Sequence, residues 1–116
     1  MRVKIVIANP ADLARRAEME LLVDTGALLS MVPGEALERI GIRPHSRRTF
    51  RLADGSHMDR ELGSAHFCWN GYEGAAPVVF GRAGDEPVLG VVTLEALGLR
   101  VDPVNERLEP MELLMI

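Results

Sequence analysis

The sequence predicts a mostly β chain that folds into a small closed barrel with one or two short helices. Many short apolar runs rich in β-branched residues are separated by Gly and Pro, and two separations, Asp54-Gly55 and Asn70-Gly71, are hairpin turn signals. Helical spacing is confined to two short segments, each followed by a glycine. With 116 residues, the chain is long enough for one domain with a buried core but too short for two, so residues 1–116 are expected to form a single domain.

The first strands are predicted from apolar, β-branched composition. Val3–Ile7 is expected to be a strand, and the turn signal Asn9-Pro10 ends it. Ala11–Arg16 fits either a helical turn or a hairpin loop. Met19–Val23 is expected to be the second strand, because it becomes fully apolar toward its end.

A tight turn at Asp24–Ala27 separates the second strand from the third apolar run, Leu28–Val32. Pro33-Gly34 stops that run, and a short helix is expected at Glu35–Ile40, since Leu37 and Ile40 share one helical face. Gly41 lies where a glycine would end the helix in the left-handed conformation.

The middle of the chain is predicted to consist of hairpins. Thr49–Phe67 alternates loosely around the turn at Asp54-Gly55, and a second hairpin is expected around Asn70-Gly71. Pro77–Phe80 and Pro87–Leu89 are expected to be further strands.

The last segment is predicted to contain a second helix and two closing strands. The helix is expected from Thr93, as its N-cap, to Leu97, with Gly98 ending it. Leu99–Val101 and the Met-rich tail Met111–Ile116 are expected to be strands, the tail lying in the chain's own core. A role of this apolar tail in a dimer interface is the alternative.

Composition excludes several classes of function. The 17 acidic and 13 basic residues give a net charge of -4, and no Lys/Arg run marks a nucleic-acid binder. No apolar run reaches the roughly 18 residues of a membrane helix. The one cysteine, Cys68, excludes an intrachain disulfide and fits a reducing compartment, so a cytoplasmic protein with no nucleic-acid or membrane partner is expected.

The histidines and the cysteine are not spaced along the sequence as the ligands of a metal site would be. His45, His57 and His66, even with Cys68, do not form the paired ligands of a zinc site, so surface or packed histidines are expected. Cys68 is interpreted as a small buried hydrophobe.

The segment with the strongest indication of chemistry is Asp24-Thr25-Gly26, directly after the apolar run Leu21–Val23. A strand that carries a carboxylate into a half-buried turn imposes a cost unless the group is hydrogen-bonded or shares a proton. Gly26 allows another backbone to approach closely or supplies a positive φ, and the Thr25 hydroxyl is able to bond to a neighbouring backbone. An ordinary strand-to-strand turn is the alternative, because Asp and Gly are common in turns.

A second, distant segment, Leu89-Gly90-Val91, complements this motif. Together they make the chain resemble the retroviral-type (retropepsin-like) aspartic proteases, in the single-domain form found outside viruses. Asp24–Ala27 is similar to the family's catalytic motif, and Ser30–Pro33 with the helix before Gly41 resembles the segment after that motif in cellular relatives. Leu89-Gly90-Val91 resembles the apolar-Gly motif beneath the active-site loop. The likeness extends from about residue 3 to residue 108.

The resemblance implies an aspartic endopeptidase that acts as a homodimer, with one catalytic aspartate from each chain and an extended peptide or protein as substrate. Two carboxylates within hydrogen-bond reach do not both ionise easily, so the pair shares a proton. The ionised member activates a water molecule that attacks the peptide carbonyl, and the protonated member hydrogen-bonds the carbonyl oxygen. No metal and no cofactor is implied.

The resemblance also assigns roles to individual residues. Asp24 would be the catalytic acid and base, and Thr25 would hydrogen-bond across the dimer to hold the two loops rigid. Gly26 would place the backbone near the substrate, and Ala27 would line the subsite next to the scissile bond.

A hairpin tip made of Ala53, Asp54 and Gly55 is placed like the family's flap, the lid that closes over a bound peptide. A plain hairpin without a lid function is the alternative for this segment. Two positions differ from many members: Leu28 stands where a small or polar residue is common, and Val91 where viral members often carry a charge.

Two other functions stay open on the sequence alone. One is a non-catalytic peptide-binding or dimerisation module on the same fold, which the single glycine of the flap tip and Val91 leave possible. The other is a small β-barrel that binds a ligand and has no pair of aspartates.

Overall fold

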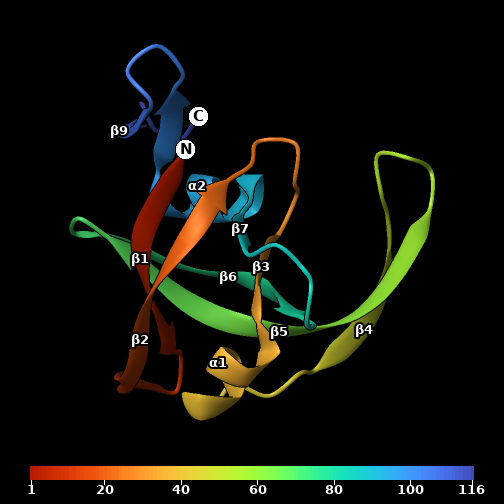
Figure 1. Cartoon of the computed structure of the whole chain (residues 1–116). Helices are drawn as coiled ribbons and strands as arrows, with labels where there is room; N and C mark the ends of the chain where they lie inside the picture. Colours follow the sequence, from red (N-terminus) through yellow and green to blue (C-terminus); the bar gives the residue numbers. More distant parts are fainter.

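The computed structural model describes all residues 1–116 and is built mainly of β-strands, as predicted. Figure 1 shows the nine strands and two helices. In chain order they are β1 (Arg2–Asn9), β2 (Asp12–Val23), β3 (Ser30–Pro33), α1 (Gly34–Arg39), β4 (Ser46–Arg51), β5 (His57–Trp69), β6 (Tyr72–Gly81), β7 (Val88–Leu89), α2 (Val91–Leu97), β8 (Leu99–Asp102) and β9 (Arg107–Pro110).

Seven of the strands form one sheet that closes on itself, which confirms the predicted barrel. The strand order is β1-β2-β7-β3-β6-β5-β4, and an additional pairing of β1 with β5 completes a ring of six strands. Two neighbouring pairs, β2 with β7 and β3 with β6, are parallel, whereas the other pairs are antiparallel. Strands β8 and β9 form a separate two-stranded sheet.

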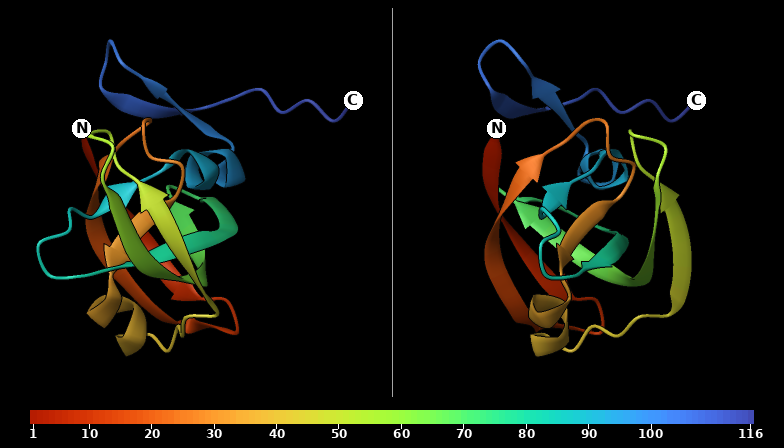
Figure 2. Two further views of the ribbon diagram at one scale, coloured as in Figure 1. Left: turned by 90° about the vertical axis from the view of Figure 1, so that its right-hand side faces the viewer. Right: turned by 45° about the vertical axis from the view of Figure 1, so that its right-hand side comes forward.

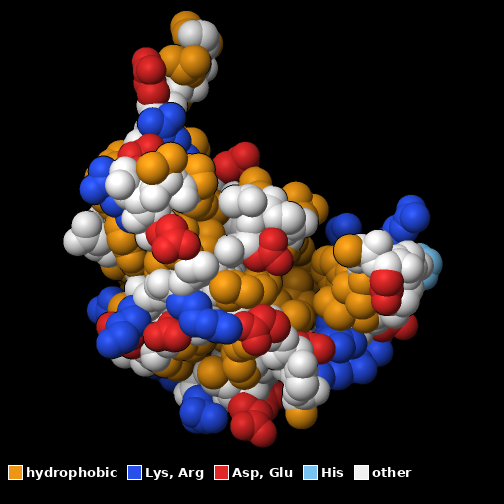
Figure 3. Space-filling model, turned by 45° about the horizontal axis from the view of Figure 1, so that its top comes forward, with side chains coloured by type: hydrophobic (Ala, Val, Ile, Leu, Met, Phe, Trp, Pro, Cys, Tyr) orange, Lys and Arg blue, Asp and Glu red, His pale blue; other side chains and the backbone are white.

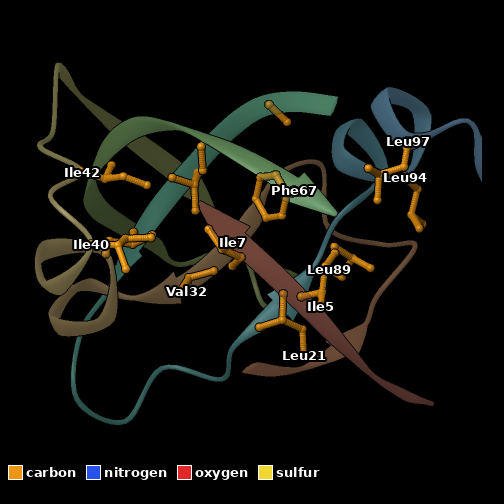
Figure 4. Close-up of a cluster of buried hydrophobic side chains, with 14 of the residues drawn as sticks. Ile5, Ile7, Leu21, Val32, Ile40, Ile42, Phe67, Leu89, Leu94 and Leu97 are labelled. Atoms are coloured by element: carbon orange, nitrogen blue, oxygen red, sulfur yellow. The ribbon is translucent and has the colours of Figure 1, made fainter. Parts of the chain in front are cut away.

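The inside of the ring is filled by apolar side chains (Figure 4). In β1, Ile5 and Ile7 are almost fully buried, as the alternation of a strand requires, and Leu21, Val32 and Phe67 meet them from three other strands. Burying each such side chain stabilises the fold by roughly 1.5–3 kcal/mol. The barrel is therefore a packed core and holds no channel.

Both predicted helices are present, and both end at the predicted glycine. After α1, the N–H of Gly41, which has a φ of +82°, donates to the carbonyl of Glu38 at 2.9 Å. After α2, Gly98 is left-handed with a φ of +69°, and its N–H donates to Glu95. The predicted N-cap of α2 is wrong: Gly90 takes that position, and Thr93 lies inside the first turn with its side chain fully buried.

The structure decides between the two alternatives for one segment and moves the start of another. Ala11–Arg16 contains no helical turn, because the hairpin turn is confined to Pro10-Ala11 and β2 already begins at Asp12. The run Leu28–Val32 becomes a strand only at Ser30, and Leu28 lies in the preceding loop.

The expectation of a core strand at Met111–Ile116 is wrong. The closing strand is β9, which pairs with β8. The N–H of Met111 donates to the carbonyl of Gly98, and the residues after Met111 pair with no strand. Its last four side chains are 66% exposed or more, and Figure 2 shows the tail leading away from the barrel. Apolar composition alone therefore did not bury this segment.

One part of the sheet extends outside the ring. Strand β5 pairs with β1 and β6 over its second half, but its first half pairs only with β4. We call this two-stranded extension, residues 46–62, the arm; Figure 2 shows it from the side. Its tip is a hairpin at the predicted Asp54-Gly55, where Gly55 has a φ of +87°. No helix in the fold has the length and apolarity needed to cross a membrane.

Candidate active site

The turn at Asp24 lies at the end of β2 and is held by short backbone hydrogen bonds. The N–H of Asp24 donates to the carbonyl of Leu89 at 3.0 Å, and the N–H of Ala27 donates to the carbonyl of Asp24 at 3.1 Å. The carboxylate Oδ1 of Asp24 accepts the N–H of Gly26 at 2.9 Å. Asp24 is half-buried, whereas Thr25 and Gly26 are exposed. The carboxyl group is thus fixed in direction but still reached by water.

Helix α2 supports this loop from below. The first N–H groups of a helix have no partner within the helix, and here two of them are used: Val91 donates to Ala27 and Val92 to Leu28, each at 2.9 Å. Gly90 makes this approach possible, because a Cβ at this position would lie 2.5 Å from the carbonyl carbon of Leu29. The sequence match at Leu89-Gly90-Val91 therefore coincides with a close backbone contact under the loop.

A buried polar network lies behind the same loop, and sequence reasoning missed it. The Ser30 hydroxyl accepts the N–H of Gly90 at 2.9 Å and is 2.5 Å from the hydroxyl oxygen of Thr93. Both side chains are 0% exposed. Two hydroxyl groups within otherwise apolar segments were the available signal, but nothing in the sequence pairs residues 63 positions apart.

The tip of the arm, with the predicted residues Ala53, Asp54 and Gly55, is exposed and bonded only to itself. The N–H of Leu52 donates to Ser56, and the N–H of Gly55 donates to Leu52. Asp54 accepts both the N–H and the hydroxyl of Ser56, and these hydrogen bonds lower the pKa of its carboxyl group. The structure brings Asp24, Thr25, Gly26 and Ala27 together in one loop but does not bring the arm tip into hydrogen-bond contact with them.

A hollow separates the arm from the barrel, and hydrophobic side chains lie on both sides of it (Figure 3). Phe50 and Met58 are cross-strand partners in the arm, and both are half-buried, whereas the alternate pair of Thr49 and Asp59 is exposed. The arm thus turns the apolar pair of Phe50 and Met58 toward the barrel (Figure 3). On the side of the Asp24 loop, Leu28 is 66% exposed.

Two further cavities are open to solvent. The larger, of about 420 Å³, lies beside α1, at the opposite end of the barrel from the Asp24 loop, and is lined mostly by polar groups. A smaller one of about 230 Å³ lies next to Thr25, where Met1 and Val23 meet the β8–β9 hairpin.

The histidines and the cysteine are dispersed. No three His, Cys, Asp or Glu side chains come together as a metal site requires. His45 and His57 are exposed, and His66 is bonded to Glu73 at 2.8 Å. Cys68 is half-buried, not fully buried as expected.

Comparison with known proteins identifies the architecture. The sequence matches no family model and no curated protein sequence. The fold is similar to the solution structure of the simian foamy virus (mac) protease, with a TM-score of 0.57 over 82% of this chain and 92% of that chain, at 18% sequence identity. The chain therefore has the fold of a retroviral protease, as the sequence predicted.

Proposed function

We propose that the chain is an aspartic endopeptidase that acts as a homodimer, with Asp24 contributed by each subunit. The observation that supports this most is the position of Asp24 in its fold: a half-buried carboxylate in a turn bonded by Gly26 and supported from below by Gly90 and α2. The same fold in a viral protease adds to it.

The chemistry requires a second carboxylate, which one chain does not place next to Asp24. In the dimer, the two Asp24 side chains would face each other and share one proton, because two carboxylates at that distance do not both ionise easily. The ionised carboxylate takes a proton from the water held between them, and that water attacks the peptide carbonyl. The protonated carboxyl donates a hydrogen bond to the carbonyl oxygen as it gains charge. The apparent pKa values would belong to the pair.

Two exposed parts of the chain are suited to meet a second copy. Thr25 is exposed and adjacent to Asp24 in sequence, and its hydroxyl would bond across the dimer axis and align the two loops. The tail exposes Leu113, Leu114, Met115 and Ile116, an apolar run that monomeric proteins rarely leave uncovered. Burial of this tail against the partner would supply part of the association energy.

The substrate would lie in the hollow between the arm and the barrel as an added strand. Backbone hydrogen bonds would hold an extended peptide, and side-chain pockets would set its preference. Ala27 would line the position next to the scissile bond, and the arm tip at Ala53, Asp54 and Gly55 would cover the peptide. Phe50 and Met58 make the facing surface apolar.

Light scattering after gel filtration, from low to high micromolar concentration, tests the dimer. A dimer mass is the expected result. A monomer at every concentration would contradict the proposal, since one chain supplies only one aspartate.

Cleavage is tested with a peptide library and the variant Asp24→Asn, which keeps the size of the side chain but removes the ionisable group. The parent is expected to cleave and to lose activity as the pH rises enough to ionise both carboxyls, and Asp24→Asn is expected to dimerise without cleaving. Unchanged turnover in Asp24→Asn would exclude the mechanism. Peptide binding without cleavage in the parent would favour a non-catalytic peptide-binding module.

A further inference from the structure

One ion pair differs from the other five in the structure. Arg60 donates from Nε to Oδ2 of Asp85 at 2.8 Å and from Nη2 to Oδ1 at 2.9 Å. The two side chains are only 13% and 16% exposed, whereas each other pair has at least one partner that is 50% exposed or more. A two-point guanidinium–carboxylate contact that is shielded from water is stronger and more directional than a surface pair.

The two partners belong to different parts of the molecule. Arg60 lies in the arm, on the same strand face as Met58. Asp85 lies in the loop between β6 and β7, which closes as a turn: Asp85 accepts the N–H of Arg82 at 2.8 Å and returns its own N–H to the carbonyl of Arg82 at 3.0 Å. The pair therefore ties the arm to this loop, which approaches the base of the arm in Figure 1.

The same loop continues directly into the support of the catalytic turn. Two residues after Asp85, the carbonyl of Pro87 accepts the N–H of Leu22 at 3.2 Å. Two residues further, the carbonyl of Leu89 accepts the N–H of Asp24 at 3.0 Å. A short, hydrogen-bonded segment thus connects the carboxylate of Asp85 with the backbone of Asp24.

The contact also offsets a repulsion between two charges within the arm. Arg48 is the direct cross-strand partner of Arg60, so two guanidinium groups stand opposite each other in the arm. Like charges in this position destabilise strand pairing. Asp85 supplies the negative charge that offsets this repulsion, from outside the arm.

We propose that Arg60 and Asp85 are positioning residues that hold the arm at a set place over the Asp24 loop, so that an extended peptide in the hollow is aligned with the catalytic carboxylates. The reaction part of this inference rests on the proposed function. The positional part concerns the arm alone and is measured without any substrate.

Hydrogen exchange of the full-length chain, followed by mass spectrometry, tests the positional part. Asp85→Asn keeps the shape of the side chain and removes its charge. Amides of the arm at residues 47–59 are expected to exchange roughly tenfold faster, because a charge-assisted hydrogen bond is lost. Glu86→Gln is the matched control: it removes the neighbouring pair with Arg2, which is half exposed, and is expected to leave the arm unchanged. Equal exchange in Asp85→Asn and Glu86→Gln would overturn the inference.

A double substitution separates the ion pair from a general loss of structure. In a chain that carries Arg60→Met, adding Asp85→Asn is expected to change arm exchange no further, because the contact is already absent. Amides in β1 and α2, which open only with the whole barrel, are expected to be accelerated less than those of the arm in every variant. Full additivity of the two substitutions would contradict the proposed contact.

Peptide kinetics test the reaction part. Asp85→Asn is expected to raise KM several-fold with little change in kcat, because the arm holds the substrate and does not touch the reacting atoms. With Asp85 intact, Arg60→Lys, which keeps the charge, is expected to raise KM less than Arg60→Met. If the parent cleaves no peptide but the exchange result holds, the proposed function fails and the arm contact stands. If the parent cleaves and Asp85→Asn matches Glu86→Gln in KM and exchange, the inference fails and the proposed function stands.

Discussion

The Asp24 loop and the tip of the arm are both tight turns that contain Asp and Gly, but they are held in opposite ways. The Asp24 loop is bonded to β7, to α2 and, through Gly90, to the buried Ser30–Thr93 pair. The arm tip is exposed, and its hydrogen bonds join only Leu52, Asp54, Gly55 and Ser56 to one another.

This difference shows how one sheet provides both a rigid and an adjustable part. The free energy of local opening is small where a segment has few buried contacts. It approaches the free energy of global unfolding where the segment is joined to the core. The Asp24 loop is therefore expected to open only with the barrel, and the arm tip to open by itself. In the proposed active site, this division would keep the reacting carboxylate fixed while the arm tip moves to admit a substrate.

The largest effect is expected from a methyl group under the rigid turn. Gly90→Ala places a Cβ 2.5 Å from the carbonyl carbon of Leu29, so backbone must move and the free energy of unfolding is expected to fall by roughly 3 kcal/mol. Gly55→Ala is the matched change in the arm. The added Cβ would meet no atom within 4 Å, so only the positive φ of this residue opposes the substitution, and the free energy of unfolding is expected to fall by about 1 kcal/mol. Urea unfolding measures both. Equal losses would remove the distinction between the two turns.

The next effect concerns the buried hydroxyl groups. Ser30→Ala leaves the N–H of Gly90 and the hydroxyl of Thr93 without their partner, which is expected to cost about 1–3 kcal/mol. Thr93→Val is expected to cost less, because Ser30 keeps its bond to Gly90. Urea unfolding of the single and double variants is the measurement, and the two losses are expected to be non-additive. A neutral Ser30→Ala would mean that the network does not support the loop.

A smaller effect is expected from acid. Hydrogen bonds from Arg60, and the N–H of Arg82, hold the pKa of Asp85 below its ordinary value. A lowered pKa in the folded state means that the stabilisation is complete above the ordinary pKa of about 4 and is lost as the pH falls through the lower value. Asp85→Asn is expected to lower the free energy of unfolding by about 1 kcal/mol at neutral pH. On acidification, the variant is expected to lose less stability than the parent does. Thermal unfolding from neutral to strongly acidic pH measures this, and parallel curves would contradict it.

The smallest effect is expected at the arm tip. The pKa of Asp54 is lowered by hydrogen bonds from Ser56, so acid below the ordinary carboxyl range should loosen the tip. Asp54→Asn is expected to speed amide exchange at residues 52–56 and to leave global unfolding unchanged, because both side-chain hydrogen bonds of Asp54 are to Ser56, within the tip. A shift of the global transition would mean that the tip is joined to the core after all.

Local features of the chain were predictable from the sequence. The alternation of Ile5 and Ile7, the turn signals at Asp54-Gly55 and Asn70-Gly71, and the left-handed glycines that end both helices depend on neighbours a few residues away. The Asp24 turn belongs to the same class, because an apolar strand followed by Asp-Thr-Gly is readable in one short segment. For these features the residue types alone determine the geometry.

The remaining features depend on contacts between distant segments, and only the tertiary structure decided them. The sequence assigned Thr93 to an N-cap, whereas packing places its hydroxyl next to Ser30. It placed the tail in the core, whereas β9 had already closed the small sheet. The contact between Arg60 and Asp85, 25 residues apart, exists only because β5 leaves the ring where the β6–β7 loop passes. Short-range preferences define strands and turns, but the free energy of a buried pair is gained only once the barrel has brought its two partners together.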